Sequence, residues 1–109
     1  MANDTFKVLM EVINERKENP MEGSYTCYLF EQGLDKILKK CGEECAEVII
    51  AAKGENQEEL KEEICDLIYH LFVLMSQQGV TLEEITRILD KRSEKIRNRK
   101  VFHQVNKDS

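Results

Sequence analysis

Two apolar segments, each interrupted by charged or polar groups, constrain the fold of this chain more than any other feature. The first, CAEVIIAA (residues 45–52), has Glu47 as its only charged residue, and the second, ICDLIYHLFVLM (residues 64–75), contains Asp66 and His70. A helix with so apolar a surface is normally buried. An ionised carboxylate is rarely buried unless it is paired or binds a metal. The sequence therefore predicts buried helices whose acidic groups need a positive partner.

Glycines and capping residues divide the chain into helical segments, and no alternating strand pattern stands out. Asn3 or Asp4 can cap a first helix. After a loop, a second helical region is expected from about residue 28 to 53, with Gly54 as its end and with Gly42 able to bend or break it. The first half of the chain is thus predicted to be helical throughout.

Two capping patterns mark the starts of the remaining helices. Asn56 with Glu59 resembles a capping box that opens a third helix, which stops at Gly79. Thr81 with Glu84 repeats the pattern for a fourth helix, whose apolar side chains are expected to face inward: Leu82, Ile85, Ile88 and Leu89. Because the connections are short, neighbouring helices should be antiparallel. The predicted fold is all-α, an antiparallel helical bundle of four to five helices.

The size and charge of the chain limit its partners. With 109 residues and no shift in composition, residues 1–109 are expected to form a single domain, with a polar tail at about residues 98–109. The net charge of −5 argues against nucleic acid as a partner. No signal-peptide pattern or membrane-spanning run is evident, so a cytoplasmic protein is expected. Because so short a chain buries a modest core, a homodimer is predicted.

Four cysteines allow two interpretations. With His70, the residues Cys41, Cys45 and Cys65 have a spacing that permits a zinc site. No Cys-x-x-Cys pair exists, however, and the three lie in apolar stripes where a free cysteine acts as a small buried hydrophobe. Reduced structural thiols, with Cys27 among them, are therefore the favoured interpretation.

Each of the two central helices carries a pair of acids one turn apart. Glu44 and Glu47 form the pair in the second helical region, and Glu63 and Asp66 form the pair in the third. Carboxylates that converge from antiparallel helices repel each other and need positive charge between them. Hard oxygen ligands suit magnesium or manganese, and inward acidic pairs are a known metal-site design in helical bundles. The pattern therefore favours a divalent cation.

A protein cation is the alternative partner for these acids. Glu47 and Asp66 can instead form salt bridges with Lys36, Lys40 or a C-terminal arginine, because burying an unpaired charge is costly. Glutamates on the outer faces of the same helices are expected to be ordinary surface residues.

The acids fall into a recognisable order. The segments GEECAEV (42–48) and EEICDLIYH (62–70) have the form Glu-Glu-x-x-Glu, a spacer, and Glu-x-x-Asp, which resembles the signature of the MazG-like all-α nucleoside triphosphate pyrophosphohydrolases. The upstream stretch GSYTCYLFEQGLDKILKKCGEE (23–44) is similar to the phosphoribosyl-ATP pyrophosphohydrolase family. The likeness covers about residues 5 to 90. It implies hydrolysis of phosphoribosyl-ATP to phosphoribosyl-AMP and pyrophosphate, the second step of histidine biosynthesis.

The resemblance also implies a set of site residues. Mg²⁺, for which Mn²⁺ is a possible substitute, would be held by the four acids of the signature: Glu44, Glu47, Glu63 and Asp66. Glu44 and Glu47 are the candidates for orienting the attacking water. The role of Glu43, which matches the first glutamate of the signature, is left open.

Other residues match the substrate side of the family. Ser24, Tyr25 and Thr26 match its loop and are candidate nucleotide contacts, although Tyr25 can equally cover the edge of the core. Lys36 and Lys40 lie one turn apart and can meet phosphate oxygens as point charges, with a pair of solvated lysines as the alternative. His70 is expected to be a hydrogen-bonded core histidine rather than a ligand.

The C-terminal segment departs from the family pattern. Many relatives have a Ser-Gly loop there, whereas DKRSEKIRNRK (90–100) contains no glycine, so phosphate-binding roles are not transferred to its basic residues. Two rival functions remain open at this point. One is a housekeeping pyrophosphohydrolase acting on other nucleotides with the same metal chemistry. The other is a non-catalytic helical module whose acids bind a basic partner.

Overall fold

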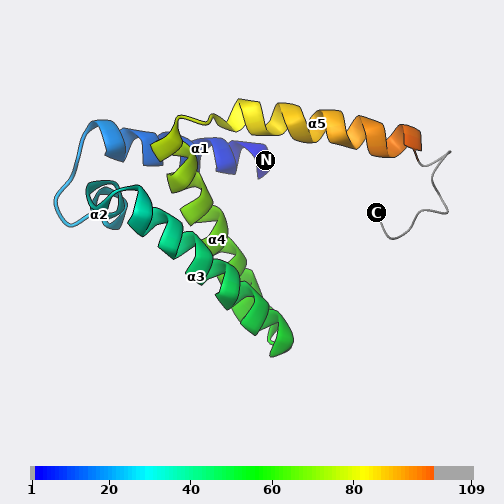
Figure 1. Cartoon of the computed structure of the whole chain (residues 1–109), viewed down its shortest axis with the longest axis horizontal. Coiled ribbons are helices and arrows are strands. Elements are labelled where there is room, and N and C mark those ends of the chain that lie inside the picture. The colour runs from blue at the N-terminus through cyan, green and yellow to red at the C-terminus, as the bar shows by residue number, and fades with distance from the viewer. Residues whose placement is uncertain (1, 100–109) are drawn as a thin grey trace. The chain divides into compact units, whose positions relative to one another are not determined.

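The computed structural model describes the backbone of residues 2–99, and the side chains of residues 5–97. This part of the chain contains five helices and no strand (Figure 1), listed in chain order: α1 (Ala2–Glu18), α2 (Tyr25–Gln32), α3 (Leu34–Lys53), α4 (Gln57–Gln78) and α5 (Leu82–Arg99). The prediction of an all-α protein with four to five helices is confirmed. The helices fall into two compact units, one that ends at Gly79 and one that begins at Val80.

The first unit is built on a hairpin of α3 and α4, which lie side by side along most of their length (Figure 1). α2 packs against both of these helices, and α1 packs against α2 and α4. Each of the four helices contributes one side chain that is almost completely buried: Ile13, Leu29, Ile37 and Val73. These four side chains form the centre of the core, at the end of the hairpin that α1 and α2 cover.

The second helical region is broken at Gly33. The sequence had instead suggested Gly42 as the place of a bend or break. Gly33 has a φ of 94°, in the left-handed region that favours glycine, and it separates α2 from α3. Gly42 is an interior position of α3 and faces open space. α2 also begins at Tyr25, three residues earlier than expected, because the Ser24 hydroxyl caps it by accepting a hydrogen bond from the Cys27 amide.

The predicted caps of the later helices are confirmed. The side chain of Asn56 accepts a hydrogen bond of 3.0 Å from the Glu59 amide at the start of α4, and Gly79 ends that helix with a φ of 74°. At the start of α5, the Thr81 hydroxyl accepts from the Glu84 amide, and the Glu84 carboxylate accepts from the Thr81 amide. These caps are local in sequence, which explains why the sequence predicts them.

Two helix ends differ in detail from expectation. Gly54 ends α3 as predicted, but it keeps a right-handed conformation, and Glu55 takes the positive φ of 60° instead. α1 begins at Ala2, before the expected caps Asn3 or Asp4.

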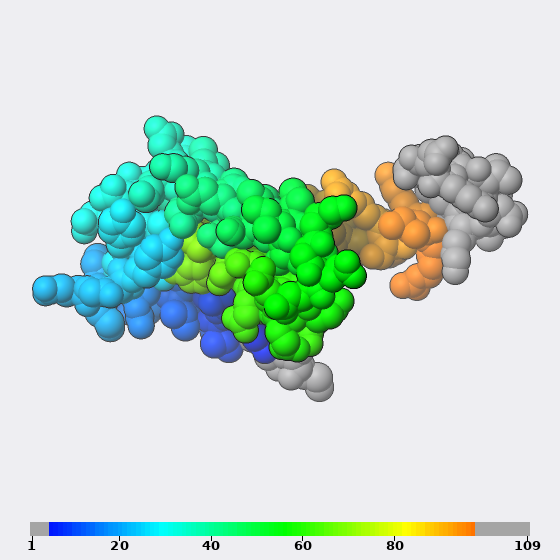
Figure 2. Space-filling view, turned by 90° about the horizontal axis from the view of Figure 1, so that it is seen from below, coloured from blue at the N-terminus to red at the C-terminus, as the bar shows by residue number. Residues whose placement is uncertain are grey.

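The distal half of the hairpin, which comprises residues 45–66, is less buried than its apolar sequence predicts. Ile49 and Ile50 are each 64% exposed, and Ile64 is 40% exposed. The hairpin extends beyond α1 and α2 (Figure 1), and the space-filling view shows the green surface of this region open toward the viewer (Figure 2). The prediction that residues 45–52 are buried is therefore wrong for most of this segment within the first unit, although Ala51 is almost completely buried.

The second unit contains α5. Ile88 and Leu89, which were expected to face inward, are about half exposed within this unit. The predicted polar tail lies beyond the described residues, except for positions 98 and 99 at the end of α5. None of the helices in the described part of the chain is long and apolar enough to cross a membrane.

Candidate metal and substrate site

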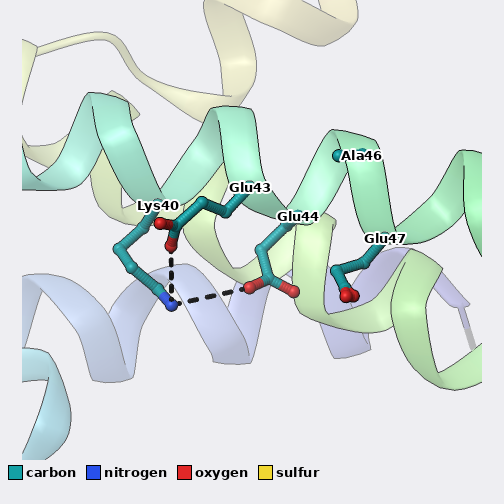
Figure 3. Close-up of a pocket in the computed structure, with 5 residues that line it drawn as sticks. All are labelled: Lys40, Glu43, Glu44, Ala46 and Glu47. Atoms are coloured by element: carbon teal, nitrogen blue, oxygen red, sulfur yellow. Dashed lines mark ion pairs between the residues drawn. The ribbon is translucent and has the colours of Figure 1, made fainter.

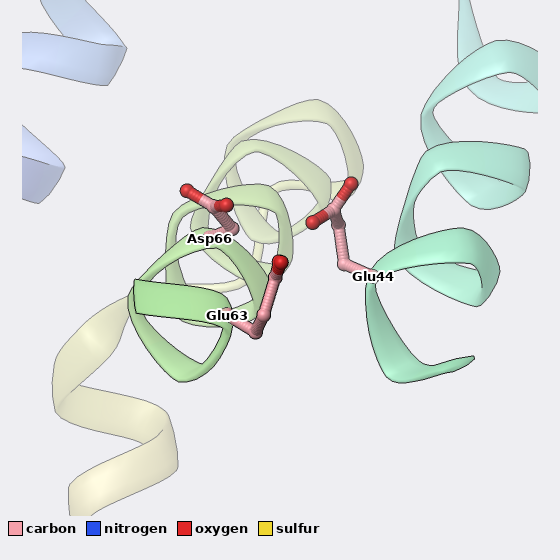
Figure 4. Close-up of side chains that lie close together, drawn as sticks. All are labelled: Glu44, Glu63 and Asp66. Atoms are coloured by element: carbon pink, nitrogen blue, oxygen red, sulfur yellow. The ribbon is translucent and has the colours of Figure 1, made fainter. Parts of the chain in front are cut away.

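Three of the four predicted metal ligands come together across the hairpin. Glu44 on α3 points toward Glu63 and Asp66 on α4 (Figure 4), and one carboxylate oxygen of each lies within 4.8 Å of the others. The spacing of three residues places Glu63 and Asp66 on the same face of α4. The short connection between the two helices then brings Glu44 opposite them. We call these three residues the carboxylate cluster.

Glu47, the fourth predicted ligand, lies one turn beyond Glu44 and outside the carboxylate cluster. Its side chain points to the same side of α3 as that of Glu44 (Figure 3) and is partly buried. Partial loss of solvent raises the pKa of Glu63, and the negative charges of Glu47, Asp66 and Glu44 raise it further. All four acids therefore share one region of negative potential.

Lys40 is the basic residue that meets this region. Its ammonium nitrogen lies 3.2 Å from a Glu43 oxygen and 3.7 Å from a Glu44 oxygen (Figure 3), and the hydrogen bond to Glu43 is the main reason that the pKa of Lys40 is raised. Within the first unit, no described lysine or arginine comes within 4.0 Å of the carboxylates of Glu47 or Asp66. Within the first unit, the salt bridges predicted as the alternative for Glu47 and Asp66 are therefore not observed, and Lys40 pairs with Glu43 and Glu44 instead.

An open hollow of about 400 Å³ lies along α3 beside these groups. It is lined by Lys40, Glu43, Glu44, Ala46 and Glu47 (Figure 3). One turn before Lys40, the ammonium group of Lys36 lies 5.8 Å from the centre of the Tyr28 ring. Along α3, the two lysines Lys36 and Lys40 are therefore followed directly by the acidic residues that line the hollow.

The predicted loop residues at the start of α2 are bonded to α4. The Tyr25 hydroxyl lies 3.0 Å from Nε2 of His70, and the Thr26 hydroxyl is hydrogen-bonded to the Tyr69 hydroxyl. Burial raises the pKa of Tyr25, against the opposing influence of the Lys40 charge. Tyr25 and Thr26 are consecutive on α2, and their partners Tyr69 and His70 are consecutive on α4. No pattern in the sequence predicted these contacts.

His70 is hydrogen-bonded on both sides of its ring, as expected of a core histidine. Nδ1 lies 2.7 Å from the carbonyl oxygen of Asp66, while Nε2 meets Tyr25, and the side chain is buried. Burial also raises the pKa of Tyr69, and the hydrogen bond with Thr26 partly offsets this rise.

The four cysteines are free thiols. Cys41 is buried, and its thiol donates to the His70 carbonyl oxygen. Cys45 and Cys65, which were expected to be buried in apolar stripes, are exposed, because they lie in the distal half of the hairpin. Among the side chains that the structure describes, none of these thiols belongs to a group of potential metal ligands.

The carboxylate cluster suits a hard divalent cation. It offers oxygen donors alone, which magnesium and manganese prefer and zinc does not require. Neighbouring and opposite oxygens around a magnesium ion lie about 3 to 4 Å apart, so the three carboxylates, with oxygens within 4.8 Å of one another, are close enough to hold one ion together. Fold and site together define an all-α protein with a carboxylate centre on a helical hairpin.

Comparison with known proteins gives this class a family. Residues 6–93 match the profile described as phosphoribosyl-ATP pyrophosphohydrolase. The chain is 57% identical over 98 residues to the phosphoribosyl-ATP pyrophosphatases of Clostridium botulinum strain Hall and of Clostridium acetobutylicum, covering 90% of this chain and 89% of each relative. It is 64% identical over 80 residues to the histidine biosynthesis bifunctional protein HisIE of Oceanobacillus iheyensis, covering 73% of this chain and 37% of that protein. The chain belongs to the phosphoribosyl-ATP pyrophosphohydrolase family, as its resemblance predicted.

Proposed function

We propose that this chain hydrolyses phosphoribosyl-ATP to phosphoribosyl-AMP and pyrophosphate, in the second step of histidine biosynthesis. Membership of the family supports the substrate, and the relatives that carry the name phosphoribosyl-ATP pyrophosphatase align over nearly the whole chain. The observation that carries the chemistry is the carboxylate cluster, in which three acids from two helices present oxygens within 4.8 Å of each other.

The proposed cofactor is Mg²⁺, with Mn²⁺ as a possible substitute. Glu44, Glu63 and Asp66 would hold it, with Glu47 next to them as the fourth ligand of the predicted set. When bound, the cation supplies positive charge that neutralises the oxygens of the reacting phosphates. Without it, partial loss of solvent and the repulsion among the carboxylates both raise the pKa of Glu63.

Glu47 and Glu44 are the proposed catalytic residues. Glu47 lines the hollow along α3, has no basic partner within its unit and stands one turn from the cluster, so its carboxylate is available to orient a water molecule and accept its proton. Glu44 reaches the same hollow while also belonging to the cluster. The two acids would thus divide the positioning of water and of the cation between them.

The substrate is proposed to extend from the cluster toward the start of α2. Lys40, which already lies beside the acids, and Lys36 would provide point charges to the phosphate oxygens. Ser24 caps α2, Tyr25 and Thr26 begin it, and all three would border the nucleotide.

We further propose that the chain acts as a cytoplasmic homodimer, with residues 1–109 as one functional domain. The exposed side chains Ile49, Ile50 and Ile64 form the apolar surface that a second copy would cover. A four-helix arrangement from two hairpins would bury the segment that the sequence predicts to be buried.

The test of the function is an assay of pyrophosphate release from phosphoribosyl-ATP, with and without Mg²⁺. We expect rapid release only with the metal, and slower turnover of ATP and other free nucleotides at equal concentration. Preference for a free nucleotide would favour the housekeeping enzyme instead. Absence of both turnover and metal-dependent stabilisation would favour the non-catalytic module.

A further inference from the structure

Two adjacent hydrogen bonds fix the first turn of α2 to α4. Tyr25 and Thr26 follow each other at the start of α2, and they bond to His70 and Tyr69, which are also consecutive. A helix of eight residues is not stable by itself, so its position depends on contacts of this kind. Together with the buried side chain of Leu29, these two bonds fix how α2 lies against α4.

The bond at His70 has a defined direction and continues to the carboxylate cluster. The Asp66 carbonyl oxygen can only accept a hydrogen bond, so Nδ1 of His70, at 2.7 Å, carries the proton. In the neutral ring Nε2 is then an acceptor, and the Tyr25 hydroxyl donates to it. Because His70 is only 6% exposed, water cannot readily replace either bond. A continuous chain thus runs from Tyr25 through His70 to the backbone of Asp66.

The two ends of this chain lie at the two halves of the proposed site. Asp66 belongs to the carboxylate cluster, and Tyr25 belongs to the turn that would border the nucleotide. Reactions that depend on alignment are sensitive to displacements of about 1 Å between bound groups. A bond that fixes the distance between these halves therefore has a kinetic consequence as well as a structural one.

We propose that Tyr25 and His70 are positioning residues, which hold the first turn of α2 in register with Asp66 so that the bound nucleotide is aligned with the cation at the carboxylate cluster. This inference rests on the proposed function. It assigns Tyr25 a task in which its hydroxyl acts on α4 through His70, rather than on the substrate.

The test compares Tyr25→Phe, His70→Asn and the double variant, with Tyr28→Phe as the matched control. Tyr25→Phe removes the hydroxyl and keeps the ring that stacks on Tyr28. His70→Asn keeps a donor near the Asp66 carbonyl but is too short to reach Tyr25. Each single variant should lower kcat about tenfold, with KM and the Mg²⁺ concentration for half-maximal activity changed less than about threefold. The double variant should be no worse than either single one, since both break the same bond.

Two further measurements separate positioning from a merely structural contact. His70→Gln, whose longer amide reaches Tyr25, should recover more activity than His70→Asn. In the metal-free protein, amide hydrogen exchange at Cys27 and Tyr28, which bond back to Ser24, should be faster in Tyr25→Phe than in wild type, and unchanged in the control Tyr28→Phe, which keeps the Tyr25 hydroxyl.

The outcomes are distinct. A wild-type protein without activity on phosphoribosyl-ATP would overturn the proposed function and this inference together. An active wild type, with kcat of Tyr25→Phe equal to that of Tyr28→Phe, would overturn the inference alone. A lowered melting temperature with unchanged kcat would also overturn it, because the bond would then be structural only.

Discussion

The two halves of the α3–α4 hairpin are built from similarly apolar sequence but have different surroundings. At the proximal end, which is the part of the hairpin that α1 and α2 cover, Ile37 and Val73 are completely buried. In the distal half, Ile49 and Ile50 remain largely exposed, and the carboxylate cluster lies on the same pair of helices. An apolar helical face thus predicts burial, but within this unit only the proximal part of the hairpin fulfils that prediction.

The comparison also separates stability from function. The proximal end contains the packed core, whereas the distal half combines repelling acids with uncovered apolar side chains. Functional sites commonly reduce stability in this way. Substitutions in the proximal core should therefore lower mainly the stability, whereas substitutions of the acids in the distal half should lower mainly the activity.

The largest effect is expected at the carboxylate cluster. Asp66→Asn and Glu63→Gln should lower the rate of pyrophosphate release by about a hundredfold or more, because several kcal/mol of charge stabilisation depend on the cation. Neither variant should be less stable than wild type without metal, since part of the repulsion is relieved. Mg²⁺ should raise the melting temperature of wild type more than that of the variants.

The matched control for this prediction is Glu62→Gln, which changes an exposed acid next to Glu63. It should behave as wild type in both measurements. If Asp66→Asn instead lost metal-free stability and kept its activity, the acids would be salt-bridged rather than metal-binding.

The next effect concerns the proximal core. Leu29 on α2 is completely buried, so Leu29→Ala should lower the free energy of unfolding by about 2–5 kcal/mol. Ile50→Ala in the distal half should cost less than about 1 kcal/mol in the monomer, because its side chain is already largely in water. Urea titration of both variants, at a protein concentration low enough to keep the chain monomeric, gives the comparison. Equal losses would mean that the two halves are packed alike.

A third prediction asks what covers the distal half. Wild type should sediment as a dimer at micromolar concentration, and Ile50→Asp should shift it toward the monomer while the helical circular dichroism is kept. Val8→Asp, at a similarly exposed apolar position on α1, is the control and should remain a dimer. A monomeric wild type would refute the predicted dimer. An Ile50→Asp variant that stays dimeric would place the interface elsewhere.

Local features of the fold were predictable, and features that depend on distant parts of the chain were not. The caps at Asn56 and Thr81 involve residues three apart, so the sequence contains all that they need. The choice between Gly33 and Gly42 as the break was not available from the sequence, because only the backbone conformation distinguishes them.

The same distinction holds for the site. Glu63 and Asp66 share a face because of their spacing, and the short hairpin connection brings Glu44 to them. The position of Glu47 outside this trio depends on how the two helices approach each other. The bond between Tyr25 and His70 joins residues 45 positions apart, and no periodicity announces it.

The smallest expected effect is the pH dependence of the stability that Glu63, in the distal half, should cause. The pKa of Glu63 is raised above its ordinary value of 4.5 in the folded, metal-free protein. The folded state therefore binds this proton more tightly than the unfolded state does. Stability from this group is fully present below about pH 4.5 and is lost as the pH rises through the raised pKa. The effect should be modest, because Glu63 keeps contact with water and its charge is partly screened.

Glu63→Gln removes this titration and leaves the shape of the side chain nearly unchanged. Melting temperatures of wild type and variant, measured without metal from pH 4.5 to 7, should therefore diverge as the pH rises, with the variant gaining on wild type. Added Mg²⁺ at pH 7 should reverse the order, since it compensates the carboxylates only in the wild-type cluster. A difference that stays constant with pH would mean that the acids do not repel one another in the folded state. The distal half would then be exposed without being electrostatically strained, and the contrast with the proximal core would be one of packing alone.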